Sequence, residues 1–353
     1  KNIGNKKILI VINSLGVGGA ERLVVDDLNE MLQQGIPARL LTLKNESPFS
    51  LSCDCAIEKT RWQVIKFGSL FNIISWIKVI RYLWEEQPDA VVTHLWFSNT
   101  IMRITCKLLG IKNVISFEQN VYDAIKTKKM FAIDRLLQGW CQKVVAVSFA
   151  VKDSLIKHGI KEKNIEVINN SIDISKYNKE PNLVLKEKLG IPKEAFVFLT
   201  VGRLIAQKGI DVLLKAFARL DGNSVLLIAG RGAEEKNFKQ LAADLNIEEK
   251  VFFLGARNDI PDILSICNIF VLASRYEGLP VVVLEAMAAA KPIIVTNFEG
   301  GRDIIVPGEN GLVVEMENSE ALAKAMDVLM LDKDLQNRLS QNARKKVQDF
   351  SIQ

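Results

Sequence analysis

The chain has 353 residues, of which 48% are hydrophobic and 25% are charged, with a formal net charge of +5. These ordinary proportions exclude a collagen, a disordered polyampholyte and a disulfide scaffold, and the length predicts two globular domains. Five cysteines without a CxxC pair and only two histidines argue against a zinc ribbon or a histidine-rich metal site. The cysteine usage, together with the lack of a signal-peptide pattern at the start, predicts a soluble protein of the cytoplasm.

Short apolar runs alternate with longer amphipathic segments, which is typical of βα units and parallel sheets. In the first half the predicted strands are Ile8–Ile12, Arg39–Leu43, Ala90–Thr93, Val114–Ser116, Val144–Val147 and Ile165–Ile168. The predicted helices between them are Ala20–Gln34, Phe71–Glu85, Asn99–Leu109, Met130–Cys141 and Phe149–His158. A polar stretch with two prolines, Ser171–Pro192, then interrupts the alternation.

The same alternation restarts after this stretch. The predicted strands are Phe196–Val201, Val225–Ala229, Val251–Leu254, Ile269–Leu272, Ile293–Thr296 and Leu312–Val314. The predicted helices include Gly209–Leu220, Glu234–Leu245 and Val281–Ala290. We therefore predict an α/β fold of two Rossmann-like, doubly wound domains, residues 1–174 and 175–353, facing each other across a cleft, with ligands at the carboxyl ends of the strands.

Three strand-to-helix loops carry candidate chemistry. The first contains Gly18 and Gly19, which allow a ligand to approach the backbone closely at the start of a helix. A glycine-rich turn without any ligand would have the same sequence pattern. The second contains Arg203 and Lys208, two cations that can converge on a diphosphate or simply be solvated.

The third loop holds two glutamates. Pro280 suits the first turn of a helix, which places Glu277 in the loop and Glu285 inside the helix. Glu285 lies among apolar residues, so its carboxylate needs a partner such as a sugar or ribose hydroxyl. Two carboxylates also suit the acid/base pair of a glycosidase, and the spacing alone leaves both chemistries open.

In their order and spacing, Gly18-Gly19-Ala20-Glu21, Arg203, Lys208, Glu277 and Glu285 resemble the retaining family 4 glycosyltransferases, which have the GT-B fold. Thr93-His94-Leu95-Trp96, Val145-Ala146-Val147-Ser148 and Asn310-Gly311-Leu312 extend the resemblance over residues 8–315.

The resemblance implies a role for each residue of the donor site. Arg203 and Lys208 would bind the donor diphosphate and stabilise the charge of the leaving group. Glu277 would contact the donor sugar and Glu285 the ribose hydroxyls. Gly18, Gly19, Gly278 and Leu279 would line the sugar-phosphate site. No cofactor or metal is implied, only the nucleotide-diphosphate sugar as co-substrate.

On the acceptor side, Glu118-Gln119-Asn120 stands where many members of that family have Glu-His-Asn. Gln119 cannot act as a general base but can bind a sugar hydroxyl, and in a front-face mechanism the leaving phosphate takes the acceptor's proton. His94, at a strand end, is a second candidate to orient or deprotonate the acceptor. The alternative is a structural role, in which a neutral His94 ring forms its hydrogen bonds with the backbone.

The first 175 residues carry 23 basic and 17 acidic side chains, and the rest carry 23 and 24. This excess fits an anionic membrane surface but also ordinary drift in surface charge. Residues 70–84 are too short and too charged to span a bilayer. The preferred prediction is a helix that packs against the core. The alternative is a peripheral contact with the inner face of the membrane, aided by the basic-apolar loop 126–131.

The predicted function is retaining transfer of a hexose from a nucleotide-diphosphate sugar, with UDP preferred, to a hydroxyl of a glycan or lipid-linked glycan in polysaccharide biosynthesis. Residues 1–174 would bind the acceptor and residues 175–353 the donor, and no nucleic-acid partner is expected. The alternatives are a sugar-nucleotide epimerase of the same fold, which the scarcity of histidine disfavours, and a non-catalytic nucleotide-sugar-binding subunit, against which the four donor residues argue.

Overall fold

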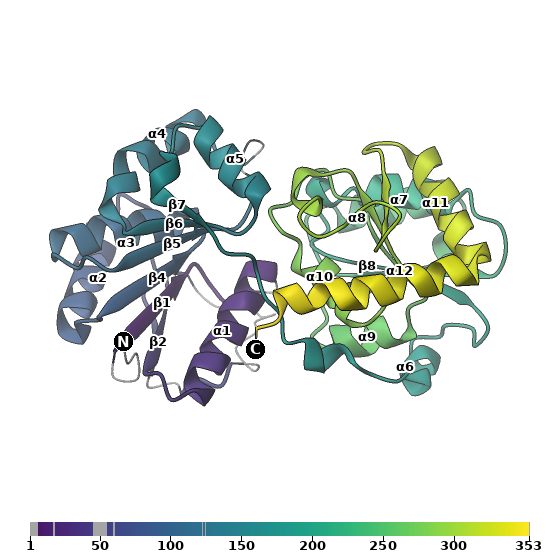
Figure 1. The fold of residues 1–353 in the computed structure, drawn as a ribbon, viewed down its shortest axis with the longest axis horizontal. Helices are drawn as coiled ribbons and strands as arrows, with labels where there is room; N and C mark the ends of the chain where they lie inside the picture. The colour runs from purple at the N-terminus through teal and green to yellow at the C-terminus, as the bar shows by residue number, and fades with distance from the viewer. Residues whose placement is uncertain are drawn as a thin grey trace. The chain divides into compact units, whose positions relative to one another are not determined.

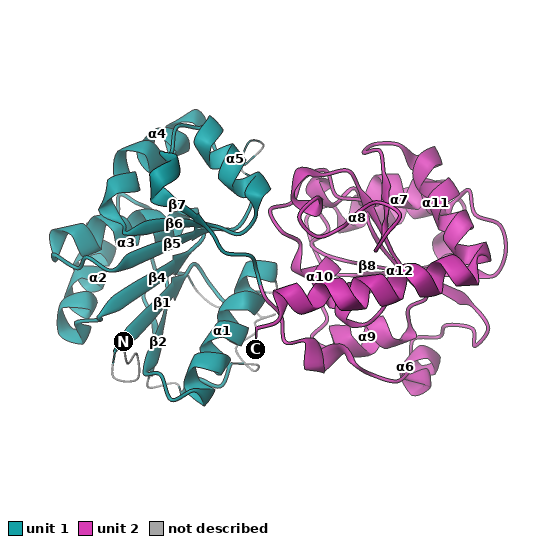
Figure 2. Ribbon diagram, in the orientation of Figure 1, with its two compact units in different colours: residues 1–170 teal, residues 171–353 magenta. Residues whose placement is uncertain are grey.

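The computed structural model describes residues 6–16, 18–44, 55–58, 61–121, 123 and 125–352. The chain divides into two compact units, residues 1–170 and 171–353 (Figure 2). The boundary therefore falls directly after Asn170 rather than after residue 174. Which ligand each unit binds stays a prediction.

Unit 1 is built on a seven-stranded sheet with the order β3-β2-β1-β4-β5-β6-β7, in which every pair of neighbours is parallel (Figure 1). The strands are β1 (Ile8–Ile12), β2 (Ala38–Thr42), β3 (Trp62–Val64), β4 (Ala90–His94), β5 (Val114–Glu118), β6 (Lys143–Ala146) and β7 (Ile165–Val167). Apolar side chains dominate these strands because helices cover both faces of the sheet.

Each face of this sheet has its own core. On one face α1 (Gly19–Gln33) packs over β1 and β2 through Val24, Val25 and Leu28. On the other face α2 (Ile73–Glu86) and α3 (Trp96–Leu108) cover the sheet, and Val79 and Ile101 belong to the same buried cluster as Val11. The remaining helices of unit 1 are α4 (Lys128–Leu137) and α5 (Phe149–Lys157).

Unit 2 is built on a six-stranded parallel sheet with the order β10-β9-β8-β11-β12-β13. The strands are β8 (Phe196–Val201), β9 (Ser224–Ala229), β10 (Val251–Gly255), β11 (Ile269–Leu272), β12 (Ile293–Thr296) and β13 (Leu312–Val314). The helices are α6 (Leu183–Lys188), α7 (Ile210–Phe217), α8 (Glu235–Asp244), α9 (Ile260–Ile266), α10 (Val281–Ala288), α11 (Ser319–Leu331) and α12 (Lys333–Lys346). The prediction of two doubly wound α/β domains is confirmed.

The two ends of unit 2 are paired with each other. The amide of Ile172 donates to the carbonyl of Phe350 at 2.9 Å, and the amide of Ile352 donates to the carbonyl of Ile172 at 3.1 Å. Ile172 and Ser351 thereby form a parallel bridge. The first and last segments of the unit therefore lie side by side.

The structure answers the question about residues 70–84 in two parts. Ser75, Val79 and Leu83 of α2 are buried against unit 1, as the core-packed reading expects. Phe71, just before the helix, and Ile74 within it are 93% and 66% exposed, however, so this segment also presents apolar side chains to solvent.

The expectation of a basic-apolar surface loop at 126–131 is wrong for two of its residues. The side chain of Lys126 is fully buried and forms ion pairs, and Phe131 is buried in α4. Neither side chain can reach a membrane surface. Among the described residues, no helix combines the length and the apolar character needed to cross a membrane.

Candidate active site

The loops after β8 and β11 meet because these strands are neighbours in the sheet of unit 2. The backbone amide of Arg275 donates to the carbonyl of Gln207 at 2.8 Å, and Gln207 Nε2 donates to the carbonyl of Tyr276 at 2.8 Å. These two bonds join the loop that carries Lys208 to the loop that carries Glu277.

Lys208 and Glu277 form an ion pair, with 2.5 Å between Nζ and Oε1, and their side chains are only 12% and 10% exposed. Ser274 Oγ donates to the same carboxylate oxygen at 2.7 Å. A side chain on Gly202 would meet the aliphatic stem of Lys208, with Cε 3.0 Å from the ideal Cβ position. Gly202 thus gives Lys208 its path toward Glu277.

Arg203 follows directly after Gly202 and is exposed. Its guanidinium has no hydrogen-bond or ion-pair partner among the described residues. A guanidinium offers five donors in a planar fork, and here that fork is open to an anion. The two predicted donor cations therefore differ, since Lys208 is paired and Arg203 is unpaired.

Glu285 lies in α10, and the hydroxyl of Tyr177 donates to its Oε1 at 2.8 Å. Tyr177 ends the short helix η5 (Ile174–Tyr177), and both side chains are buried. The sequence indicated that this carboxylate needs a partner, and Tyr177 is one. Tyr177 is not predictable as this partner from the sequence, because it lies in a polar stretch without periodicity.

Gly278 and Leu279 lead into α10, whose N-cap residue Pro280 provides no side-chain cap. Gly300, in the loop after β12, approaches this segment so closely that a Cβ would lie 2.0 Å from the Gly278 carbonyl oxygen. The backbone at the start of α10 is therefore held by a neighbouring loop, and the amides of a helix start favour an anion.

In unit 1, Gly18 is the N-cap residue of α1 and Gly19 is its first residue. Glu21 folds back over Gly18, where a Cβ would lie 2.3 Å from its Oε2. The Glu21 carboxylate therefore lies beside the N-cap residue of α1, and the link between this loop and a donor stays a prediction.

His94 ends β4 and is buried, with its ring stacked on Phe117 at 4.7 Å between centroids. Gln119 Nε2 lies 3.3 Å from His94 Nδ1. Because an amide nitrogen only donates, Nδ1 accepts and the ring proton lies on Nε2. Burial lowers the pKa of His94 to about 3, so the imidazole is neutral at physiological pH.

Three features beside His94 are unusual for a plain structural loop. Leu95 has a φ of 73°, a conformation that costs a residue other than glycine about 1–3 kcal/mol. Trp96 Nε1 and Asn120 Oδ1 are buried, and no partner of either is present among the described residues. A donor and an acceptor that lack partners mark a place where a polar ligand can bind.

Glu118, in contrast, has a partner for each of its carboxylate oxygens. Its Oε2 lies 2.9 Å from Lys126 Nζ, and its Oε1 accepts a bond from Asn99 at 3.1 Å. Arg103 and Asp134 complete a buried group of four charges, in which Lys126 Nζ also lies 2.8 Å from Asp134 Oδ2. We call these four residues the buried quartet.

The charges of the buried quartet balance, and its two carboxyl groups respond differently. Burial alone would raise the pKa of Glu118, but Lys126 and Arg103 hold it below its ordinary value. Burial and the charge of Glu118 raise the pKa of Asp134. Glu118 would have to leave these partners to touch an acceptor, so its place supports a positioning role, and its predicted acceptor contact stays a prediction.

Among the described residues no cluster of three or more His, Cys, Asp or Glu side chains could hold a metal ion. The predicted donor residues of unit 2, Arg203, Lys208, Glu277, Gly278, Leu279 and Glu285, occupy the loops after β8 and β11 and the start of α10. His94, Gln119 and Asn120 lie at the ends of β4 and β5 in unit 1. The arrangement offers an anion site beside carboxylates in one unit and a neutral polar site in the other.

Comparison with known proteins agrees with this arrangement. The model of Glycosyltransferase Family 4 matches residues 17–176, and the model of Glycosyl transferases group 1 matches residues 182–346. The Escherichia coli UDP-Gal:alpha-D-GlcNAc-diphosphoundecaprenol alpha-1,3-galactosyltransferase is 30% identical over 287 residues, which cover 77% of this chain and 74% of that enzyme.

A second relative comes from Campylobacter jejuni, an N-acetylgalactosamine-N,N'-diacetylbacillosaminyl-diphospho-undecaprenol 4-alpha-N-acetylgalactosaminyltransferase. It is 25% identical over 363 residues, covering 98% of this chain and 96% of the relative. Among solved structures, Anabaena HepE in complex with UDP and glucose superimposes with a TM-score of 0.89 at 22% identity, covering 99% of this chain and 96% of HepE. The chain thus belongs to the family 4 glycosyltransferases, also described as glycosyl transferases group 1, and has their GT-B fold.

Proposed function

We propose that this protein transfers a hexose from a UDP-sugar to a hydroxyl of a lipid-linked glycan, with retention at the anomeric carbon, in the synthesis of a surface polysaccharide. Unit 2 binds the donor and unit 1 binds the acceptor. The observation that carries the proposal is the Lys208–Glu277 pair at neighbouring strand ends, with the unpaired Arg203 beside it.

A nucleotide sugar presents a diphosphate directly next to a sugar ring. Arg203 and Lys208 supply the positive charge for the diphosphate, and Glu277 supplies a hydrogen-bond acceptor for sugar hydroxyls at the point where the two meet. Glu285, positioned by Tyr177, binds the ribose hydroxyls. UDP is the preferred nucleotide because HepE, which shares the fold, binds UDP and the Escherichia coli relative uses UDP-galactose.

In the transfer step the bond between the anomeric carbon and the β-phosphate oxygen breaks, and a bond from the anomeric carbon to the acceptor oxygen forms on the same face. The acceptor's proton passes to the leaving phosphate, so no side chain has to act as base. Arg203 and Lys208 stabilise the charge that develops on that phosphate. Neutral His94, with its proton on Nε2, orients the acceptor together with Gln119 and Asn120.

The acceptor class rests on two relatives whose acceptors are diphospho-undecaprenol-linked sugars. Such an acceptor stands at a membrane surface, so we also propose that the protein works at the inner face of the cytoplasmic membrane. The exposed apolar face of α2 supports this peripheral contact.

The test is transfer from UDP-glucose, UDP-galactose and UDP-N-acetylglucosamine to a synthetic polyprenyl-diphosphate-linked N-acetylglucosamine, followed by mass spectrometry and by NMR of the new linkage. We expect an α-linked product from one of these donors. UDP binding without any product would support a non-catalytic binding subunit, and a nucleotide sugar inverted at a ring carbon would support an epimerase. Either result would overturn the proposal.

The residue assignments are tested in the same assay. Replacing Lys208 by Ala should lower kcat/KM by about 10²–10³-fold, because a donor to a developing oxyanion is lost. The control is Lys215→Ala, which removes an exposed lysine from α7 in the same unit and should leave the rate unchanged. Similar rates for Lys208→Ala and Lys215→Ala would remove Lys208 from the donor site.

A further inference from the structure

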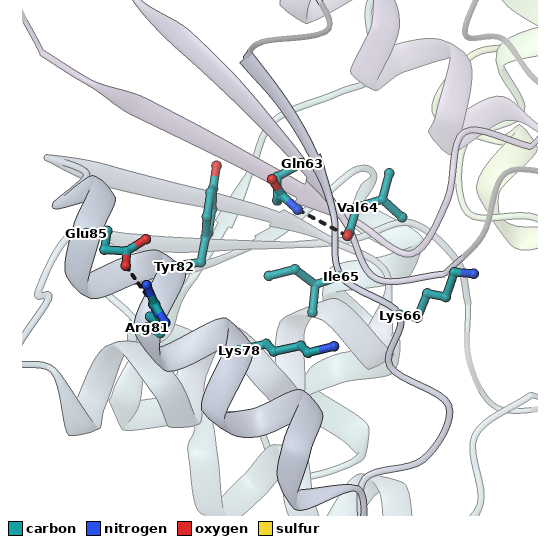
Figure 3. Close-up of a pocket in the computed structure, with 8 residues that line it drawn as sticks. All are labelled: Gln63, Val64, Ile65, Lys66, Lys78, Arg81, Tyr82 and Glu85. Atoms are coloured by element: carbon teal, nitrogen blue, oxygen red, sulfur yellow. Dashed lines mark hydrogen bonds and ion pairs between the residues drawn. The ribbon is translucent and has the colours of Figure 1, made fainter.

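A pocket of about 490 Å³ in unit 1 lies outside the residues assigned to transfer (Figure 3). One wall is β3 and the residues that follow it, Gln63 to Lys66. The other wall is α2, which contributes Lys78, Arg81, Tyr82 and Glu85. The two walls are tied together, since Ser75 Oγ of α2 donates to the Lys66 carbonyl at 2.9 Å.

The pocket has a neutral end and a cationic end. At one end Arg81 Nε binds Glu85 Oε1 at 2.7 Å, which balances both charges. Lys66 and Lys78 lie toward the other end, as Figure 3 shows, and neither has an ion-pair partner among the described residues. Two ammonium groups without a balancing charge suit a phosphate group.

Exposed apolar side chains lie in the first turns of α2 and just before this helix. Phe71, Ile73, Ile74 and Ile77 are 93%, 72%, 66% and 59% exposed. Ile74 and Lys78 are four positions apart in α2, so they lie on the same face of the helix, and the apolar residues adjoin the cationic end. Exposed apolar groups that gather in one place mark an interaction site rather than ordinary surface.

These side chains are held in place by the structure around them. Trp76 Nε1 donates to the Leu70 carbonyl at 2.8 Å, and the Trp76 ring packs edge-on against Phe67 at 5.2 Å between centroids. Asn72 caps α2 by accepting from the Ser75 amide. The segment that presents Phe71 is therefore anchored at both ends, and little order is lost when Phe71 enters another apolar phase.

We propose that this pocket binds the phosphate of an anionic phospholipid in a bilayer while Phe71, Ile73, Ile74 and Ile77 enter the adjoining acyl region. The charge is complementary, because Lys66 and Lys78 are unbalanced and unit 1 carries the basic excess of the chain. A free phosphate would satisfy the lysines but leave the apolar groups in water, whereas a lipid satisfies both. This inference deepens the proposed membrane contact and rests on it.

The experiment is co-sedimentation of the full chain with phosphatidylcholine vesicles, with and without phosphatidylglycerol. We expect binding that needs phosphatidylglycerol and that falls about tenfold in Lys66→Gln/Lys78→Gln. The matched control, Lys161→Gln/Lys163→Gln, removes the same charge from exposed positions of the same unit and should lose no more than about twofold. An equal loss of vesicle binding in both double variants would mean that the positive charge of unit 1 acts diffusely, and it would overturn the assignment of the lipid phosphate to this pocket.

A second pair of variants tests the apolar part. Ile74→Ser/Ile77→Ser should abolish sedimentation, while Leu108→Ser/Leu136→Ser, at equally exposed leucines of unit 1, should not. No effect of the first pair, or no sedimentation of the unmodified chain, would overturn the proposal. The melting temperature is also measured with inorganic phosphate alone. A rise in the unmodified chain that is absent in Lys66→Gln/Lys78→Gln, without vesicle binding, would assign the pocket to a soluble anion and overturn the lipid site.

UDP-induced melting shifts, measured on the same samples, separate this proposal from the proposed function. A pocket variant that fails to sediment yet still responds to UDP has lost lipid binding alone. If the unmodified chain sediments but gives no response to UDP, the donor assignment fails while the lipid site stands.

Discussion

Gly209 shows why a single residue type is required where the donor loop ends. Its φ is +60°, and a Cβ there would lie 2.0 Å from the Ala273 carbonyl oxygen. The loops after β8 and β11 can approach only because this position has no side chain. The contact of Lys208 with Glu277 depends on that approach.

Gly209→Ala should therefore lower the free energy of unfolding of unit 2 by about 1–3 kcal/mol and weaken UDP binding. The control is Gly222→Ala, since Gly222 also has a positive φ, +94°, but no atom within 4 Å of its Cβ position. Urea unfolding gives the stability and calorimetric titration gives the affinity. Equal losses in the two variants would show that backbone strain, and not the contact with Ala273, limits this site.

His94 adds a pH dependence to unit 1. Its pKa is lowered to about 3 by burial, so between that value and its ordinary 6.5 the unfolded chain binds a proton that the folded chain does not. Stability should then be lost as the pH falls through this range, by up to about 1.4 kcal/mol per pH unit. Unfolding midpoints of the unmodified chain and His94→Asn should converge as the pH falls from 7 to 5. Parallel curves would contradict a neutral, buried imidazole.

At the scale of elements, the buried quartet joins α3, β5, α4 and the segment before α4. Arg103 lies in α3, Glu118 ends β5, Asp134 lies in α4 and Lys126 precedes it. Breaking a buried ion pair is costly because the remaining charge loses its partner. By holding the end of β5, the quartet positions Gln119 and Asn120 beside His94.

Lys126→Met should accordingly destabilise unit 1 by about 3–5 kcal/mol. Lys128→Met, an exposed lysine two residues away in α4, should change the stability by less than about 0.5 kcal/mol. Circular dichroism during urea unfolding measures both. UDP binding should survive the first substitution, because its predicted ligands lie mainly in unit 2. A loss below about 1 kcal/mol would contradict the ion pairing of Lys126.

The elements also show where prediction from sequence succeeds. β1, β8, β11, β12 and β13 have the predicted bounds, because each is an apolar run between turn signals. β3 (Trp62–Val64) was missed, because an edge strand with the exposed Gln63 at its centre has no apolar run. The sequence also shows that Lys126 is charged but not that it is buried, and burial depends on partners such as Asp134 and Arg103.

For the molecule as a whole, the fold was predictable from the sequence, and the contacts among the predicted donor residues were not. Glu277 and Lys208 are 69 positions apart, and Tyr177 and Glu285 are 108 apart. The strand order of unit 2 brings the first pair together, and the packing of η5 against α10 brings the second, and local sequence patterns contain neither. The family resemblance predicted the roles of the glutamates, while the partners Tyr177 and Ser274 required the structure.

Hydrogen exchange should locate the donor site within the whole molecule. UDP should slow amide exchange at 202–209 and 277–285, and at the start of α1 near Gly18, while the end of β5 stays unchanged. The protection should vanish in Lys208→Ala. Protection centred on His94 and Gln119 instead would place the nucleotide in unit 1 and reverse the assignment of the two units.

The paired ends of unit 2 bear on how such proteins can be assembled and engineered. Because Ile172 and Ser351 are bonded neighbours, the polypeptide enters and leaves this half of the protein at a single point. A segment with adjoining ends can be spliced into a surface loop of a host protein, or opened elsewhere and rejoined there, without stretching its chain. Unit 2, the proposed donor-binding unit, is therefore suited to genetic transplantation, which would combine its proposed donor specificity with versions of unit 1 that differ in acceptor preference.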